Sequence, residues 1–173
     1  PVDMKNRIAA FAACFLAILL VSPSLAQVQP GQGEIEAYDG LFRAAADGDL
    51  DAIERLTAEG AKLNARDGRK RTPLMVAAHL NQYAAARALI AAGANVDAFD
   101  ADRYDVITIA AVADDPEMLR IAIAGGANTS LVTSVYDGTA LIAAAHLGHD
   151  EVVRTLIEHD APLPFTLLSV VTE

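Results

Sequence analysis

The sequence predicts an all-α solenoid of stacked helix-turn-helix units, and three observations support this fold class. Hydrophobic residues make up 53% of the 173 residues but aromatic residues only 5%, so burial must come from many close helix contacts. Pairs of alanines recur 33, 33 and 34 residues apart, at Ala44-Ala45, Ala77-Ala78, Ala110-Ala111 and Ala144-Ala145. The same steps separate the apolar residues Leu41, Leu74, Ile107 and Leu141. A repeat of this length is typical of solenoids, in which stacking supplies the core that one hairpin cannot form.

Two columns of helix-breaking residues divide each unit. The first column predicts the end of the first helix and contains Gly48, Asn81, Asp114 and Gly148, all of which tolerate a left-handed backbone. The second column predicts the end of the second helix and contains Gly60, Gly93, Gly126 and Asp160. Asp49 and Asp115 follow the first column as expected N-caps, and Pro116 is expected at the first helical position. Each unit is therefore interpreted as helix, turn, helix, turn and loop.

The stretch "TPLMVAAHLNQYAAARALIAAGANVDA", residues 72–98, resembles an ankyrin repeat. It contains the Thr-Pro-Leu opening, the alanine pair and the closing Gly-Ala-Asn of that family, although Met75 replaces the usual histidine. Residues 137–163 are similar, whereas units one and three lack Thr-Pro, and Asp105-Val106 stands in its place in unit three. The resemblance implies an ankyrin-repeat solenoid with β-turn fingers. Its four repeats span residues 39–66, 67–99, 100–133 and 134–163.

The ends of the chain differ from the repeats. Met4, the basic "KNR", the apolar "IAAFAACFLAILLV" and the small-residue "SPSLA" predict a secretory signal peptide, so residues 1–26 are expected to be removed before Gln27. The alternative is an uncleaved membrane anchor. We expect an exported protein that has no membrane contact after cleavage. The periplasm is the favoured location, and the extracellular space is the alternative. Residues 27–38 are predicted to be a flexible lead, and residues 164–173 a non-repeat or truncated tail that leaves the last repeat uncapped and able to self-associate.

Composition and motifs argue against several classes of function. Without residues 1–26, 11 basic and 22 acidic residues remain, a net charge of −11 that disfavours nucleic-acid binding. The single cysteine, Cys14, lies in the apolar run, so the mature chain has no thiol for a disulfide or a metal. No nucleophile elbow or phosphate-binding glycine loop occurs, and the histidines lack metal-site spacing. We therefore predict a non-enzymatic chain without cofactor or metal; a hydrolase with a carboxylate pair is kept only as a hypothesis to test.

The resemblance implies that another protein binds to the fingers and to the exposed side of the first helices. In this register the candidate contacts are Arg69, Arg71, His79, Asp102, Tyr104, Val112, Tyr136 and His146. Arginine and tyrosine are frequent anchors of protein interfaces. Tyr104 and Tyr136 have an alternative role, which is packing between neighbouring fingers. A second functional hypothesis is an accessory or effector subunit that modulates an envelope enzyme through the basic finger, residues 66–71.

Overall fold

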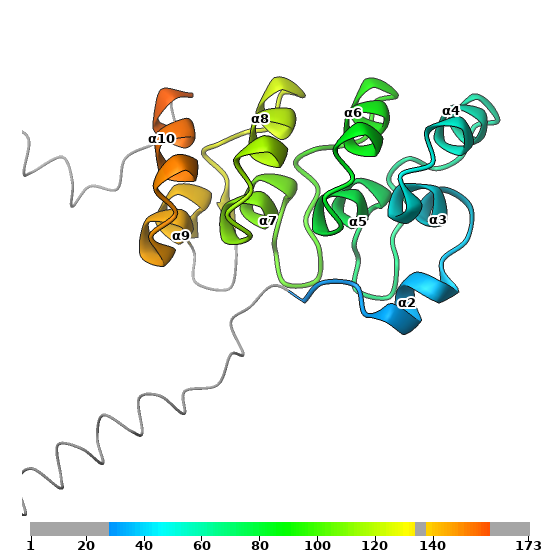
Figure 1. Ribbon diagram of the computed structural model, residues 1–173, viewed down its shortest axis with the longest axis horizontal. Coiled ribbons are helices and arrows are strands. Elements are labelled where there is room, and N and C mark those ends of the chain that lie inside the picture. The colour runs from blue at the N-terminus through cyan, green and yellow to red at the C-terminus, as the bar shows by residue number, and fades with distance from the viewer. Residues whose placement is uncertain (1–27, 134–137, 160–173) are drawn as a thin grey trace, which may run out of the picture.

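The computed structural model describes residues 28–133 and 138–159 and confirms an all-α solenoid (Figure 1). The helices are α2 (Gln32–Ala37), α3 (Gly40–Asp47), α4 (Leu50–Ala58), α5 (Pro73–His79), α6 (Tyr83–Ala91), α7 (Val106–Val112), α8 (Pro116–Ala124), α9 (Ala140–Leu147) and α10 (Asp150–Glu158). The two short strands β1 (Val132–Thr133) and β2 (Gly138–Thr139) pair antiparallel. The predicted signal peptide, Tyr136 and the tail at 164–173 lie outside the described residues. Within the described part, no helix combines the length and the hydropathy that a membrane crossing requires.

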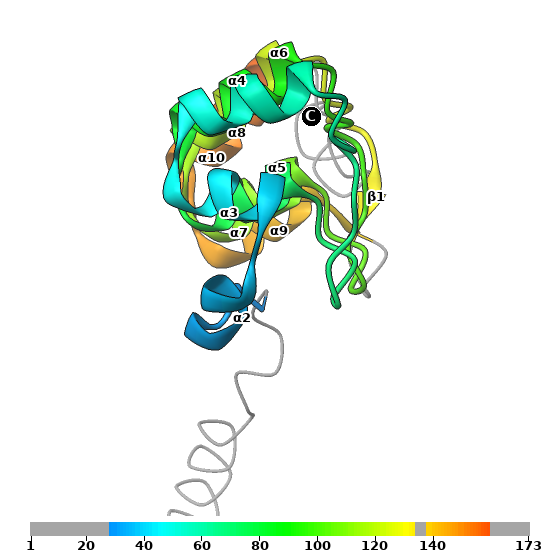
Figure 2. The same cartoon turned by 90° about the vertical axis from the view of Figure 1, so that its right-hand side faces the viewer.

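The helices form two rows. The first helices of the units, α3, α5, α7 and α9, lie in an inner row, and α4, α6, α8 and α10 lie in an outer row (Figure 1). The described fingers, residues 66–71 and 99–104, extend from one side of the stack (Figure 2), and the strands β1 and β2 lie on the same side. The alanine pairs of the first three units lie where the rows meet, and Ala45, Ala77 and Ala111 are each 0% exposed; in the fourth pair Ala144 is buried but Ala145 is exposed. Their small size allows the close helix contacts that the composition predicted.

The predicted helix ends are confirmed by the backbone. Gly48, Asn81, Asp114 and Gly148 have φ angles of 70°, 55°, 53° and 78°, so the whole first column is left-handed. The caps are confirmed as well, because the side chains of Asp49 and Asp115 accept hydrogen bonds from Ala52 N and Met118 N. In unit three, the Asp105 side chain accepts from Thr108 N, just as that of Thr72 accepts from Met75 N in unit two. Asp105 therefore replaces the missing threonine as an N-cap.

Polar contacts join neighbouring units on both sides of the core. The buried hydroxyl groups of Thr108 and Thr133 lie 2.6 Å apart and join α7 to the strand β1 that leads into unit four. His149 Nδ1 lies 2.8 Å from the carbonyl oxygen of Ala111, so this histidine joins the turn before α10 to α7 of the preceding unit. The outer row carries two ion pairs between units, Arg87 with Glu117 at 2.6 Å and Arg120 with Glu151 at 2.7 Å.

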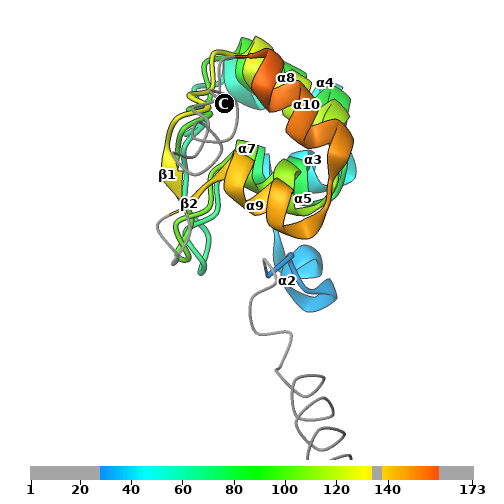
Figure 3. The ribbon, with the colours of Figure 1, turned by 90° about the vertical axis from the view of Figure 1, so that its left-hand side faces the viewer.

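The expectation of a flexible lead is wrong for residues 28–38, which we call the N-terminal lead. This segment contains helix α2 and lies against the inner row on the finger side (Figures 1 and 2). Sequence patterns missed it because its contacts join residues about 30 or more positions apart, outside the repeat register. A view from the opposite end shows that no other described segment lies over the inner helices α7 and α9 on that side (Figure 3).

Candidate binding surface

The candidate contacts among the described residues lie on or near one surface, which we call the inner face. It consists of the inner helices and the adjoining side of the fingers. Arg69 and Asp102 are half-exposed there, and their side chains form an ion pair of 2.9 Å that joins the first finger to the second. The two side chains are therefore partly accessible to a partner and also hold the two fingers together. An exposed ion pair of this kind contributes about 1 kcal/mol or less to stability.

Arg71 does not have the exposed position that we expected. Its side chain is 0% exposed, and its Nε donates to Asp67 Oδ2 at 2.7 Å while Nη2 donates to Glu34 Oε1 at 2.6 Å. Nη1 donates to the carbonyl oxygen of Val28 at 3.3 Å. The lead therefore covers Arg71 and uses all of its guanidinium nitrogens, which removes this residue from the surface.

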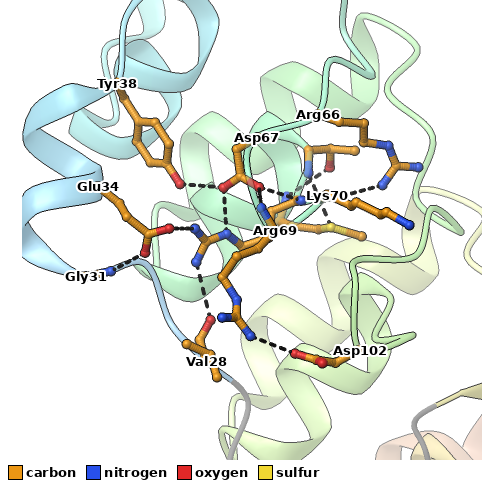
Figure 4. A network of polar contacts seen from close by, with 12 residues as sticks. Val28, Gly31, Glu34, Tyr38, Arg66, Asp67, Arg69, Lys70 and Asp102 are labelled. Atoms are coloured by element: carbon orange, nitrogen blue, oxygen red, sulfur yellow. Dashed lines mark hydrogen bonds and ion pairs between the residues drawn. The ribbon is translucent and has the colours of Figure 1, made fainter.

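Asp67 connects the finger to the lead in a single network (Figure 4). Its Oδ1 accepts the backbone N–H groups of Arg69 and Arg71, at 2.9 and 2.8 Å, which fixes the finger turn. Its Oδ2 accepts the phenolic hydroxyl of Tyr38 at 2.7 Å as well as the Arg71 guanidinium. Glu34 accepts the N–H of Gly31 at 2.8 Å through its second oxygen. A chain of charge-assisted bonds thus runs from the finger into α2.

The network shifts the pKa values of its members. Burial alone would raise the pKa of Asp67, but the hydrogen bonds from Tyr38, Arg71 and Arg69 outweigh burial and hold it below the ordinary value. The bond from the Gly31 N–H, together with the Arg71 charge, lowers the pKa of Glu34. Burial and the Asp67 carboxylate raise the pKa of Tyr38. At neutral pH the two carboxylates are therefore charged and the phenol is protonated, as the network requires.

The three predicted helix positions differ in exposure although they share one register. His79 is only 7% exposed, Val112 is half-buried and His146 is exposed. Burial, and then the positive charge of Arg71, lower the pKa of His79 to about 4. Its Nε2 has no hydrogen-bond partner among the described residues. His79 is thus a neutral buried group, and the prediction that it faces a partner is corrected.

Tyr104 is also buried, at 7% exposure. Its backbone N–H donates to Asp100 Oδ1 at 2.8 Å, so it closes the second finger. Of the two roles that the sequence left open, packing is the one the structure shows for Tyr104. Tyr136 lies outside the described residues.

Arg66, another cation of the first finger, also binds within the chain. Arg66 Nη1 donates to the carbonyl oxygens of Lys70 and Phe99, both at 2.6 Å, and so joins two fingers. Lys70 is exposed at the tip, with a φ of 60°. The basic finger is therefore mainly a structural element, and its accessible charge is smaller than the sequence suggested.

Metal chemistry has no visible site in the described part. Across residues 28–133 and 138–159, no group of three or more histidine, cysteine, aspartate or glutamate side chains lies close enough to hold an ion.

Asp67, Glu34 and Tyr38 are site residues that sequence reasoning missed. The spacing of Asp67 and Arg71 was a usable signal for one pair, but no pattern linked either residue to the lead.

These features define a class of protein, a repeat solenoid that presents one face and a row of fingers. A family model described as ankyrin repeats (3 copies) matches residues 11–100 and 41–130, and a model described as ankyrin repeat matches residues 136–164. The chain belongs to the ankyrin-repeat family. No curated protein matches it. Ankyrin-repeat proteins are generally non-enzymatic interaction modules, and the repeats indicate a scaffold for protein-protein interaction.

Proposed function

We propose that this scaffold acts in the cell envelope, after export and cleavage before Gln27, and that it binds its partner through the part of the inner face that the lead leaves open. The observation that carries this proposal is the change of exposure along one register. His79 is covered, whereas Val112 is partly accessible and His146 is exposed. The half-exposed Asp102 adds a charge from the second finger to the same region.

The physical basis is a rigid stack whose inner surface can vary without loss of the core. The core depends on the alanine pairs and on the apolar residues that pack around them. Val112 and His146 follow these pairs; Val112 packs against the core but is only half-buried, and His146 is exposed, so both side chains have surface available for contacts. An apolar centre beside polar neighbours is a common composition for a protein interface.

The alternative, an effector that modulates an envelope enzyme through the finger at 66–71, has less support. Arg66 and Arg71 are bound within the chain, and Arg69 pairs with Asp102. Lys70 alone would have to provide most of the accessible charge of that finger.

Crosslinking capture from the envelope fraction tests the proposed surface. The bait would be the chain from Gln27, compared with a variant that carries Val112→Glu and His146→Glu. A matched control carries Ala91→Glu and Ala124→Glu, which add the same charge at exposed positions of the outer helices. We expect one protein to be captured by the wild type and the control but not by the inner-face variant. Equal capture by all three baits would refute the surface.

Cell fractionation tests the location separately. Mass spectrometry of the chain recovered from the periplasmic fraction should show an N-terminus at Gln27. An intact N-terminus in the cytosolic fraction would refute export.

A further inference from the structure

The first two fingers fold by the same device but carry different side chains at their last position. Asp67 and Asp100 each accept, through Oδ1, the backbone N–H groups two and four residues later, at 2.8 to 2.9 Å. The last of these residues is Arg71 in the first finger and Tyr104 in the second. Since the second finger forms with a tyrosine at this position, the finger turn does not require the arginine side chain.

The side-chain groups that the turn does not use are directed at the lead. Arg71 offers two nitrogens, one to the Glu34 carboxylate at 2.6 Å and one to the Val28 carbonyl at 3.3 Å. Asp67 offers its Oδ2 to the Tyr38 hydroxyl at 2.7 Å (Figure 4). Together they form a site with two donors and one acceptor, in a geometry that distinguishes a carboxylate from a phenol.

The lead occupies this site in the manner of a bound peptide. The apolar core of the described residues begins at Leu41 and includes no residue of the lead. Within residues 28–38 only Pro30 is buried, and α2 contains no buried residue. A segment that is held mainly by polar side-chain contacts opens at a lower free energy than a core helix.

We propose that Arg71 and Asp67 form a recognition site for a peptide segment with a glutamate and, four residues later, a tyrosine. The lead is the ligand of this site within the chain, and a partner segment of the same chemistry displaces it. This site is distinct from the region around Val112 and His146, so the inference does not rest on the function proposed above.

A peptide titration of the full chain tests this site. The probe is a synthetic peptide of residues 28–39, "VQPGQGEIEAYD", added to isotope-labelled chain and followed by nuclear magnetic resonance. The receptor variant carries Glu34→Gln and Tyr38→Phe, which remove the carboxylate charge that pairs with Arg71 and the phenolic hydroxyl that donates to Asp67, but leave Arg71, Asp67 and the ring contact of residue 38 with Phe42 in place. We expect the peptide to bind this variant at least about tenfold more tightly than the wild type, because a tethered segment competes at an effective concentration of about millimolar. The Arg71 Nε–H resonance should move on binding.

Two controls make the result specific. A peptide that carries Glu34→Gln and Tyr38→Phe should lose binding to the receptor variant. A chain that carries Val112→Glu and His146→Glu, in addition to the two lead substitutions, should bind the unsubstituted peptide unchanged even if it no longer captures a partner. Circular dichroism establishes that each chain is folded. Equal affinity of the peptide for the wild type and the variant, absence of binding to the variant at millimolar peptide, or equal binding of the substituted peptide would overturn the proposal.

Discussion

Acidification should destabilise the protein through His79, because this side chain is buried in its neutral form. The pKa of His79 falls from an ordinary 6.5 to about 4 in the folded chain. Between these two values the unfolded chain binds a proton at this residue and the folded chain does not. The free energy of unfolding therefore decreases as the pH falls below about 6.5, and the loss is complete near the folded pKa. From about pH 7.5 to about pH 5 the expected loss is about 2 kcal/mol, since each pKa unit corresponds to about 1.4 kcal/mol.

Urea unfolding followed by circular dichroism measures this effect. His79→Leu replaces the imidazole by an apolar side chain of similar size without a titrating group, so the variant should lose about 2 kcal/mol less than the wild type over the same pH range. His146→Leu, at the exposed position of the same register, is the matched control and should follow the wild type. The groups of known charge near His79 are Arg71 and Asp67, and the lowered pKa of Asp67 keeps its carboxylate ionised throughout this range. Identical pH dependence of the wild type and His79→Leu would refute the argument.

Two further predictions concern stability. Arg71→Leu leaves the Asp67 carboxylate, which is only 6% exposed, without its ion pair and should lower the free energy of unfolding in urea by about 3 kcal/mol. Glu34→Gln changes a side chain that is 42% exposed and should lower it by less than about 1 kcal/mol. Equal losses for the two variants would contradict the difference in burial. Gly125→Ala places a Cβ 2.7 Å from Ile90 Cγ2 and should cost roughly 1 to 3 kcal/mol in thermal unfolding. Gly33→Ala meets no atom within 4 Å in α2 and should be neutral or stabilising by up to about 1 kcal/mol; the reverse order would show that the contact with Ile90 is easily relieved.

The repeat architecture was predictable because it depends on local backbone chemistry. Gly48 and Asn81 each end the first helix of their unit, and their left-handed φ angles were expected from residue type alone. Asp105 shows how far this logic extends, since it caps α7 although the family's threonine is absent. Such features repeat along the chain and can be compared between units.

The binding surface was less predictable because the lead has no counterpart in the repeats. Register alone gives His79 and His146 the same environment, but the first is buried and the second is exposed. Arg71 was expected at the surface because of its register in the finger, whereas its charge is neutralised by Asp67 beside it and by Glu34, 37 residues earlier. A contact of that separation leaves no periodic signal in a single sequence.

The ion pairs of the outer row have a mechanical consequence. Arg87 with Glu117 and Arg120 with Glu151 bridge adjacent outer helices, while the apolar core holds the units together at the centre of the stack. A change in the curvature of the stack alters the spacing of the outer helices and therefore of these exposed pairs. Each pair contributes about 1 kcal/mol or less to stability. Salt screens exposed charges, so a higher ionic strength weakens these contacts between the outer helices. The same fold can therefore be stiffer in dilute buffer than in salt, without any difference in its core.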